Sequence, residues 1–287
     1  MIIVIDGINQ HKFKDVLDEM FKLRARVFGD RLGWEVNIQD GREFDQFDSL
    51  NPAHVVSIND EGDVVGCMRL LQTTGPHMLA DVFSSILDDE PPIRSAQVWE
   101  ATRFCVDTKR LGRGRGKNSV SYVTSEVMIG SFEYAQEAGV LDSVAVIDPV
   151  MNRVLQRSGN APYDYVGTAK PMGKVVAMAA LMDCSDERIQ SIREYSSIDY
   201  DVFLTDDQAL ELFNSGQQAK LAKAGAANLD HQPLTDLEKY FVEQMHAATT
   251  KEEVQAVLKL IESLSDRFTP EQKTALLQTP RAFAHEA

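Results

Sequence analysis

The chain has 287 residues, of which 44% are hydrophobic and 25% are charged, and its formal net charge is −15. This composition provides enough apolar material for a folded core and excludes an intrinsically disordered chain. The acidic balance argues against general binding to nucleic acid or to an anionic membrane surface, because both depend on a basic protein surface. An anionic partner would therefore need a local basic patch.

The cysteines and the start of the chain bear on its compartment. Cys67, Cys105 and Cys184 are the only cysteines, and this odd, widely spaced set predicts neither a disulfide framework nor a thiolate metal site. The histidines lack helical ligand spacing as well, so we expect no metal. Residues 1–6 carry no basic lead or cleavage site and predict a first strand. No apolar run has the roughly 18 residues of a membrane span. From the cysteine pattern we expect a cytoplasmic protein.

Residues 1–204 alternate between the hydrophobic spacings of helices and those of strands. Interleaved helices and strands favour an α/β sandwich around a mixed sheet over a helical bundle or an all-β fold. The expected helices are 10–28, 118–138, 149–157 and 185–195, and the expected strands are 1–6, 53–59, 63–72, 97–107, 140–147, 163–169 and 175–182.

Residues 205–287 differ in character and predict a second, all-helical segment. Pairs with capping-box spacing mark helix starts, so we expect three or four helices, with 215–233 as a partly flexible link. The segment has 8 Lys and Arg against 13 Asp and Glu, a net charge of −5, and offers no basic docking surface. We expect it to support the first domain or to form a homodimer. The pairs are Thr205 with Gln208, Thr235 with Glu238, Thr250 with Glu253, and Thr269 with Gln272.

An acidic cluster lies between the first predicted helix and the first predicted hairpin, at Glu43, Asp45 and Asp48. Carboxylates this close in sequence repel one another, so a fold that keeps them together needs cations nearby. Those cations are either arginines of the protein or a positively charged ligand. A solvated acidic loop is the alternative.

Glu100 and Arg103 lie within one strand pattern. Strict alternation places Glu100 on one face, with Thr102 and Phe104, and Arg103 on the other. A β-bulge would let both side chains point into one cleft, and bulges are common beside active sites.

A basic loop runs from Arg110 to Lys117 and alternates basic residues with glycines before a predicted helix. Glycine lets backbone N–H groups approach a phosphate, the helix start adds positive potential, and arginines add charge-assisted hydrogen bonds. The spacing is not that of a nucleotide P-loop, and a solvated turn is the alternative. The phosphate-binding candidates are Arg110, Arg113, Arg115 and Lys117.

Taken in order, these residues resemble the acyl-homoserine-lactone synthases, the LuxI-type autoinducer synthases of bacterial quorum sensing. The resemblance spans residues 1–205 and rests on the order and spacing of short motifs. These are Arg24-x-x-x-Phe28, Arg31-Leu-Gly-Trp34, Glu43-x-Asp45-x-Phe-Asp48, Gly66-x-x-Arg69-Leu, Phe83, and Glu100-x-x-Arg103-Phe.

The resemblance implies a fold like that of the GCN5-related acetyltransferases, a three-layer sandwich whose mixed central sheet splays open. It implies two substrates and no cofactor. S-adenosylmethionine supplies the amine, and an acyl carrier protein, or coenzyme A in some members, supplies a fatty acyl thioester. Acyl transfer is followed by lactonisation with release of methylthioadenosine. On family grounds we expect the carrier protein to be the donor.

The resemblance also implies roles for individual residues. The ammonium nucleophile must lose a proton, so the site needs a base. Glu100 is favoured over Glu43, and Arg103 is expected to hold Glu100 ionised or to orient the substrate. Aromatic faces for the adenine or the sulfonium are expected from Phe28 and Trp34. The expected S-adenosylmethionine-binding set is Arg24, Phe28, Trp34, Asp45, Asp48 and Arg69.

The acyl donor is expected to meet a different set of residues. Backbone N–H groups near Phe104 and Val106 would stabilise the thioester oxyanion. Counting back from Arg157-Ser-Gly159 places Ala145 beside the acyl chain, with Ser143 as the alternative position. Alanine cannot hydrogen-bond a 3-oxo group, which favours unsubstituted or 3-hydroxy chains. The further candidates are Phe83 for the acyl chain and Arg153 and Arg157 for the carrier.

Two other functions fit part of this pattern. A related acetyltransferase-fold enzyme acting on another amine would share the fold and the phosphate loop. It would not need the set of Arg24, Phe28, Trp34 and the aspartates. A non-catalytic acyl-binding module, in which the helical segment captures a partner, would keep the fold; Glu43, Glu100 and Arg103 together argue against lost catalysis, although binding alone could also keep them.

Overall fold

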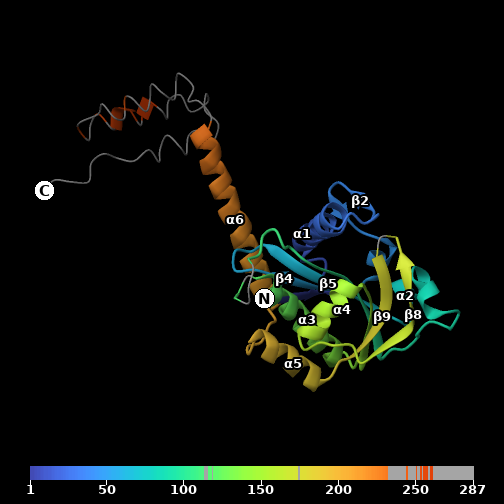
Figure 1. Ribbon diagram of the computed structural model, residues 1–287. Coiled ribbons are helices and arrows are strands. Elements are labelled where there is room, and N and C mark those ends of the chain that lie inside the picture. Colours follow the sequence, from blue (N-terminus) through green and yellow to red (C-terminus); the bar gives the residue numbers. More distant parts are fainter. Residues whose placement is uncertain are drawn as a thin grey trace. The chain divides into compact units, whose positions relative to one another are not determined.

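The computed structural model describes residues 1–112, 116–117, 119–173 and 175–231, with single positions between 244 and 260 (Figure 1). The chain divides into two compact units, Met1–Gln217 and Gln218–Ala287. The elements up to residue 231 are β1 (Ile2–Ile5), α1 (Lys14–Arg24), the π-helical η1 (Ala25–Arg31), β2 (Ile38–Gln39), β3 (Arg42–Glu43), the 3-10 helix η2 (Gln46–Leu50), β4 (Ala53–Ile58), β5 (Val64–Gln72), α2 (Met78–Asp81), η3 (Ser84–Leu87), β6 (Val98–Val106), α3 (Val120–Glu137), β7 (Asp142–Ile147), α4 (Pro149–Arg157), β8 (Asp164–Met172), β9 (Val175–Asp183), α5 (Asp186–Ser196) and α6 (Asp206–His231).

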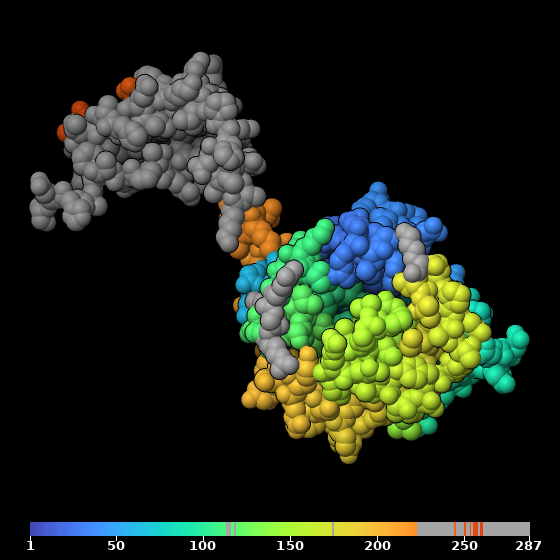
Figure 2. Space-filling view, viewed as in Figure 1, coloured from blue at the N-terminus to red at the C-terminus, as the bar shows by residue number. Residues whose placement is uncertain are grey.

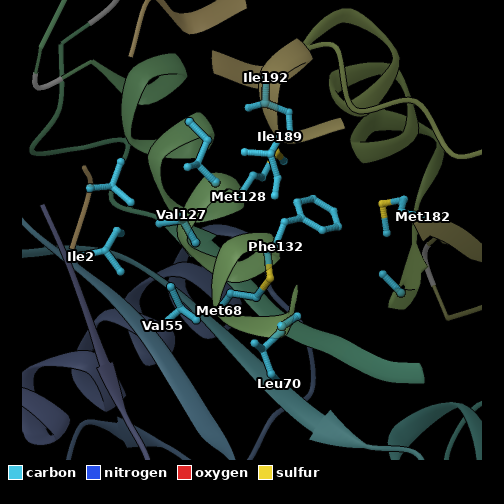
Figure 3. Close-up of a cluster of buried hydrophobic side chains, with 14 of the residues drawn as sticks. Ile2, Val55, Met68, Leu70, Val127, Met128, Phe132, Met182, Ile189 and Ile192 are labelled. Atoms are coloured by element: carbon cyan, nitrogen blue, oxygen red, sulfur yellow. The ribbon is translucent and has the colours of Figure 1, made fainter. Parts of the chain in front are cut away.

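The first unit is built around a seven-stranded sheet in the order β1-β4-β5-β6-β7-β9-β8. β6 and β7 are parallel, and the other neighbouring strands are antiparallel. One buried cluster joins the sheet to α3 and α5, and Figure 3 shows Phe132 of α3 among side chains of β5, β9 and α5. A second cluster joins the sheet to α1 and to the start of α6. Helices therefore cover both faces, and the predicted α/β sandwich with a mixed sheet is confirmed.

The predicted elements of residues 1–204 are found within a few residues of their expected bounds. The first helix differs, because α1 begins only at Lys14 and continues as the π-helical η1 to Arg31. Sequence periodicity did not predict β2, β3, η2, α2 or η3. These elements are too short to show a hydrophobic period.

The segment after residue 205 begins as predicted. The N–H of Thr205 donates to the side chain of Gln208, and the N–H of Gln208 donates to Oγ1 of Thr205, which is the predicted capping box. The same reciprocal pair forms between Thr250 and Glu253. The prediction of a partly flexible link at 215–233 is wrong for residues 215–231, because α6 continues through them without a break. Alanine-rich sequence sustains the helix there despite its glycines. The remaining two capping pairs lie outside the described residues.

Candidate active site

Arg24 is the last residue of α1, and its side chain is completely buried. Its Nε donates to Oε2 of Glu43 at 2.6 Å, and its Nη1 and Nη2 donate to the two oxygens of Asp48 at 2.8 and 2.9 Å. Burial opposes the charged form, yet Asp48 and Glu43 raise the pKa of Arg24 above its usual value. Arg24 is therefore a permanent cation with carboxylates on two sides.

Arg69 lies on β5 and is also buried. Its guanidinium donates to both oxygens of Asp45, at 2.6 and 3.0 Å, and its Nη1 reaches Oδ1 of Asp48 at 2.8 Å. Burial alone would raise the pKa of Asp48, but the hydrogen bonds and charges of Arg24 and Arg69 hold it below its usual range. The prediction that cations hold the acidic cluster together is confirmed, and arginines of the protein supply them.

Arg103 completes the ionic network from a β-bulge in β6. The register between β5 and β6 shifts between Cys67 and Arg69, and Arg103 has a φ of +52°. This left-handed conformation is unfavourable for a residue with a side chain. It turns the Arg103 guanidinium to Glu43, at 3.1 Å, and to Asp45, at 2.7 Å. The predicted bulge is therefore present.

A local turn holds the two aspartates in place. The N–H of Asp45 donates to Oδ2 of Asp48 at 2.8 Å, and the N–H of Phe47 donates to Oδ1 of Asp45 at 2.9 Å. These bonds cap η2, which begins at Gln46. An aspartate at the first position of such a turn satisfies backbone donors that would otherwise be unpaired. This local turn therefore presents both carboxylates to the arginines.

The two predicted aromatic residues lie against each other. The rings of Phe28 and Trp34 stack with centroids 5.3 Å apart and an angle of 21° between their planes. Phe28 is buried, whereas Trp34 is 41% exposed. The guanidinium of Arg103 lies over the Phe28 ring, 5.7 Å from its centroid. This pair joins an accessible aromatic face to the ionic network.

Glu100 is completely buried and faces the start of α2. Its two oxygens accept the backbone N–H groups of Met78 and Leu79 at 2.7 and 2.6 Å. Burial raises the pKa of Glu100 to about 7, although these two hydrogen bonds oppose the rise. Arg103 was expected beside Glu100, but the bulge directs it to Glu43 and Asp45 instead. Met78 lies between Glu100 and Arg103, because its N–H donates to Glu100 and its Sδ is 3.4 Å from Nη1 of Arg103.

The central sheet opens beside this network. β6 pairs with β7 only from Val98 to Glu100, although both strands continue beyond these pairs. The N–H of Asp107 donates to the carbonyl of Val65 on β5. Because backbone groups alternate sides along an antiparallel ladder, those of Val106 point away from β5, toward the open side of β6. The predicted splayed sheet is confirmed. Beyond Glu100, the backbone donors of β6 are not paired with β7.

The predicted acyl-binding side chains fall into two groups. Phe104, Val106 and Ala145 belong to the buried cluster under α3. Phe83 packs instead against clusters that contain Met78, Leu79 and Val144. The structure therefore places Phe83 near the start of α2, apart from the cluster that holds Ala145.

Part of the predicted basic loop is described. Nη1 of Arg110 lies 2.7 Å from Oδ1 of Asp63, and Nζ of Lys117 lies 3.2 Å from Oδ2 of Asp60. Arg113 and Arg115 lie outside the described residues. Ser119 caps α3 by accepting the N–H of Tyr122, so the predicted loop-to-helix transition is present.

Sequence reasoning missed two features of the site. Arg26 and Arg31 of η1 reach the residues that follow β6, where Nη2 of Arg26 lies 3.3 Å from Asp107 and Nη1 of Arg31 donates to Thr108 at 2.6 Å. The backbone of α2 supplies both donors to Glu100. No sequence signal marks these contacts, because they join segments far apart in the chain.

The described residues contain no group of three or more His, Cys, Asp or Glu side chains placed to hold a metal ion. None of the helices in the described part of the chain combines the length and the hydropathy of a membrane span.

A mixed sheet that splays between β6 and β7, with a charged site at the bulge, is the arrangement expected for the GCN5-related acetyltransferase fold. The autoinducer synthase family model matches residues 9–192. The acyl-homoserine-lactone synthase of Agrobacterium fabrum is 34% identical over 178 residues, which cover 62% of this chain and 83% of that protein. The chain belongs to the autoinducer synthase family.

Solved structures agree with this assignment. The acyl-homoserine-lactone synthase LasI is 30% identical, with a TM-score of 0.57 over 68% of this chain and 95% of LasI. MesI, a CoA-dependent acyl-homoserine lactone synthase, is 25% identical, with a TM-score of 0.60 over 70% of this chain and 98% of MesI. The chain is thus an enzyme of the acyl-homoserine-lactone synthase class, which favours this class over the two other functions that the sequence left open.

Proposed function

We propose that this protein joins a fatty acyl group to the amine of S-adenosylmethionine and closes the product to an acyl-homoserine lactone. The amine attacks the thioester carbonyl, and the donor thiol leaves. The methionine carboxylate then displaces methylthioadenosine from the carbon bound to sulfur. The observation that carries this proposal is the ionic network of Arg24, Arg69 and Arg103 beside an exposed aromatic ring, in a chain of this family.

S-adenosylmethionine is a sulfonium with a zwitterionic amino-acid end. Trp34 offers an accessible ring, and Phe28 supports that ring from behind. A cation over such a ring is stabilised by roughly 0.5–2 kcal/mol. Asp45 and Arg103 are the most solvent-exposed members of the ionic network, at 17% and 13% of their side chains. They are therefore the members best placed to meet the charged end of the substrate.

Glu100 is the proposed base. Its pKa of about 7 lets the carboxylate accept a proton near neutral pH. Each of its oxygens keeps a lone pair after accepting one backbone N–H, and its burial favours proton transfer through one water. Glu43 is less suited to this role, because Arg24 and Arg103 hold both of its oxygens.

The tetrahedral oxyanion needs donors where the sheet opens. The N–H of Val106 is the proposed donor, because the backbone of Val106 points to the open side of β6. Preorganised backbone donors of this kind supply a large part of the stabilisation in acyl transfer. The thioester carbonyl would lie between β6 and β7, with its acyl chain toward Phe104 and Ala145. The methyl side chain of Ala145 favours unsubstituted or 3-hydroxy chains.

An acyl carrier protein is the proposed donor, and acyl-CoA is the alternative. α4 contributes to the yellow-green surface in Figure 2. It carries the exposed residues Val150, Arg153, Val154 and Arg157 at helical spacing. Such a face fits an acidic helix with apolar side chains. Arg110 and Lys117 would meet the phosphopantetheine phosphate. Arg153→Ala and Arg157→Ala should raise the KM for the carrier donor and leave the KM for S-adenosylmethionine unchanged.

The test offers purified protein S-adenosylmethionine with carrier-bound and with CoA-bound acyl chains. Calorimetry measures substrate binding, and mass spectrometry identifies the lactone and methylthioadenosine. We expect lactone formation, with the carrier donor favoured and its KM rising steeply with salt. Absence of both binding and methylthioadenosine release would refute the function. Equal or better turnover with acyl-CoA would refute only the carrier as donor.

Residues 205–287 are proposed to support the catalytic domain or to form a homodimer. α6 begins within this segment and packs Ala209 and Phe213 into the second buried cluster. A chain truncated after Gln217 keeps that contact. If the truncated chain is monomeric in solution while the full chain is dimeric, the remainder carries the dimer contact. If both are monomeric, dimerisation through this segment is refuted.

A further inference from the structure

Two described cations of the basic loop, Arg110 and Lys117, already have carboxylate partners inside the protein. Arg110 pairs with Asp63 at 2.7 Å, and Lys117 pairs with Asp60 at 3.2 Å. Both aspartates lie at the turn between β4 and β5, a hairpin distant in sequence from the loop. Asp107 also lies 3.6 Å from Nε of Arg110. A phosphate that approaches these cations meets a surface on which much of their charge is balanced.

Helix α6 holds the same hairpin from its other side. A Cβ added at Gly62 would lie 2.6 Å from the carbonyl oxygen of Leu212, and one added at Gly216 would lie 2.2 Å from that of Glu61. The two backbones therefore touch at a pair of glycines, and Gly62 also needs its φ of +71° to make the turn. Phe213, one turn before Gly216, is buried in the second cluster. The hairpin and α6 are therefore in direct backbone contact.

This helix lies beyond the family match. The autoinducer synthase model ends at residue 192, and α6 begins at Asp206. The family match thus does not include the helix that contacts the turn carrying Asp60 and Asp63.

We propose that Asp60 and Asp63 are internal counter-ions that weaken binding of the acyl donor's phosphate at Arg110 and Lys117, and that α6 holds them there. The inference rests on the proposed function, because it assigns the donor phosphate to this loop. The phosphate must displace each carboxylate or share a cation with it, so the aspartates set donor affinity. S-adenosylmethionine binds at the ionic network and is unaffected.

The test compares Asp60→Asn and Asp63→Asn with the wild-type full chain. Each variant should lower the KM for the acyl donor about two- to fivefold, the range expected for partly exposed ion pairs. The KM for S-adenosylmethionine should not change. Asp88→Asn is the matched control, because it removes an exposed pair of the same kind, with Lys170, away from the loop. It should leave both KM values unchanged.

A second variant tests the role of α6. Gly216→Ala favours the helix itself but forces the hairpin away from α6. It should therefore lower the KM for the acyl donor when it is made in the wild type. In the Asp60→Asn/Asp63→Asn double variant it should have no further effect on this KM. An active enzyme whose donor KM is the same in wild type and in both single variants would overturn the inference alone. A wild-type protein that makes no lactone would overturn the proposed function, and this inference with it. If the Gly216→Ala chain does not fold, the donor KM values of the two aspartate variants decide the inference.

Discussion

Arg24 and Arg69 donate to the same carboxylate oxygen, since Nη1 of each lies 2.8 Å from Oδ1 of Asp48. Arg24 ends α1 and Arg69 lies on β5, so one side chain of η2 ties the helix to the sheet. Both guanidinium groups are buried, and water cannot easily replace a lost partner. Loss of one partner would leave a buried charge unpaired, so the network matters for the fold as well as for the proposed binding site.

Asp48→Asn should lower the free energy of unfolding by about 3 kcal/mol, because it leaves two buried guanidinium groups short of a negative charge. Denaturant unfolding measures the loss. Asp18→Asn is the control, since Asp18 pairs with Lys22 at the surface and should cost less than about 1 kcal/mol. Losses of equal size in the two variants would contradict a stabilising role for the buried network.

Acid should weaken the fold through the same carboxylate. Despite burial, Arg24 and Arg69 hold the pKa of Asp48 below its ordinary 3.8, so the unfolded chain takes up this proton more readily than the folded one. The stabilisation from Asp48 is therefore complete above about pH 4 and is lost as the pH falls below it. The difference in unfolding free energy between wild type and Asp48→Asn should narrow from pH 7 toward pH 3. A constant difference would argue against this linkage.

Glu100→Gln should cut turnover by about 10²–10⁴-fold, the usual contribution of a general base. In the wild type the rate should rise with pH through about 7, as Glu100 loses its proton, and the variant should lack this rise. Binding of S-adenosylmethionine, followed by calorimetry, should persist and would show that α2 remains in place. The exposed Glu90→Gln is the control and should behave as wild type. Unchanged turnover in Glu100→Gln would remove Glu100 from the base role.

Arg103→Gly and Arg103→Ala separate the backbone of the bulge from its charge. The φ of +52° disfavours alanine but suits glycine, so the glycine variant should be more stable by about 0.5–1 kcal/mol in denaturant unfolding. Both variants lack the guanidinium that reaches Glu43 and Asp45. They should therefore lose S-adenosylmethionine affinity to the same extent in calorimetry. An alanine variant as stable as the glycine variant would show that the bulge carries no backbone strain.

Much of the local structure followed from sequence patterns. Hydrophobic spacing predicted the strands and helices of the sandwich, and the Thr205–Gln208 spacing predicted the start of α6. Strict alternation would have placed Glu100 and Arg103 on opposite faces of the strand, and the expectation that both face one cleft predicted a bulge. These features depend on residues near one another in the chain, so local chemistry is sufficient to predict them.

By itself, the sequence indicated most of the acids, arginines and aromatic rings that the structure brings together in the candidate site, because they occur in a recognisable order. Only the tertiary structure decided which of them pair. Arg103 turned to Glu43 and Asp45, and Glu100 received the backbone of α2. These partners come from separate segments, and the strand register, the bulge and the packing of α1 on the sheet set their distances. Short-range patterns carry no information on such long-range geometry.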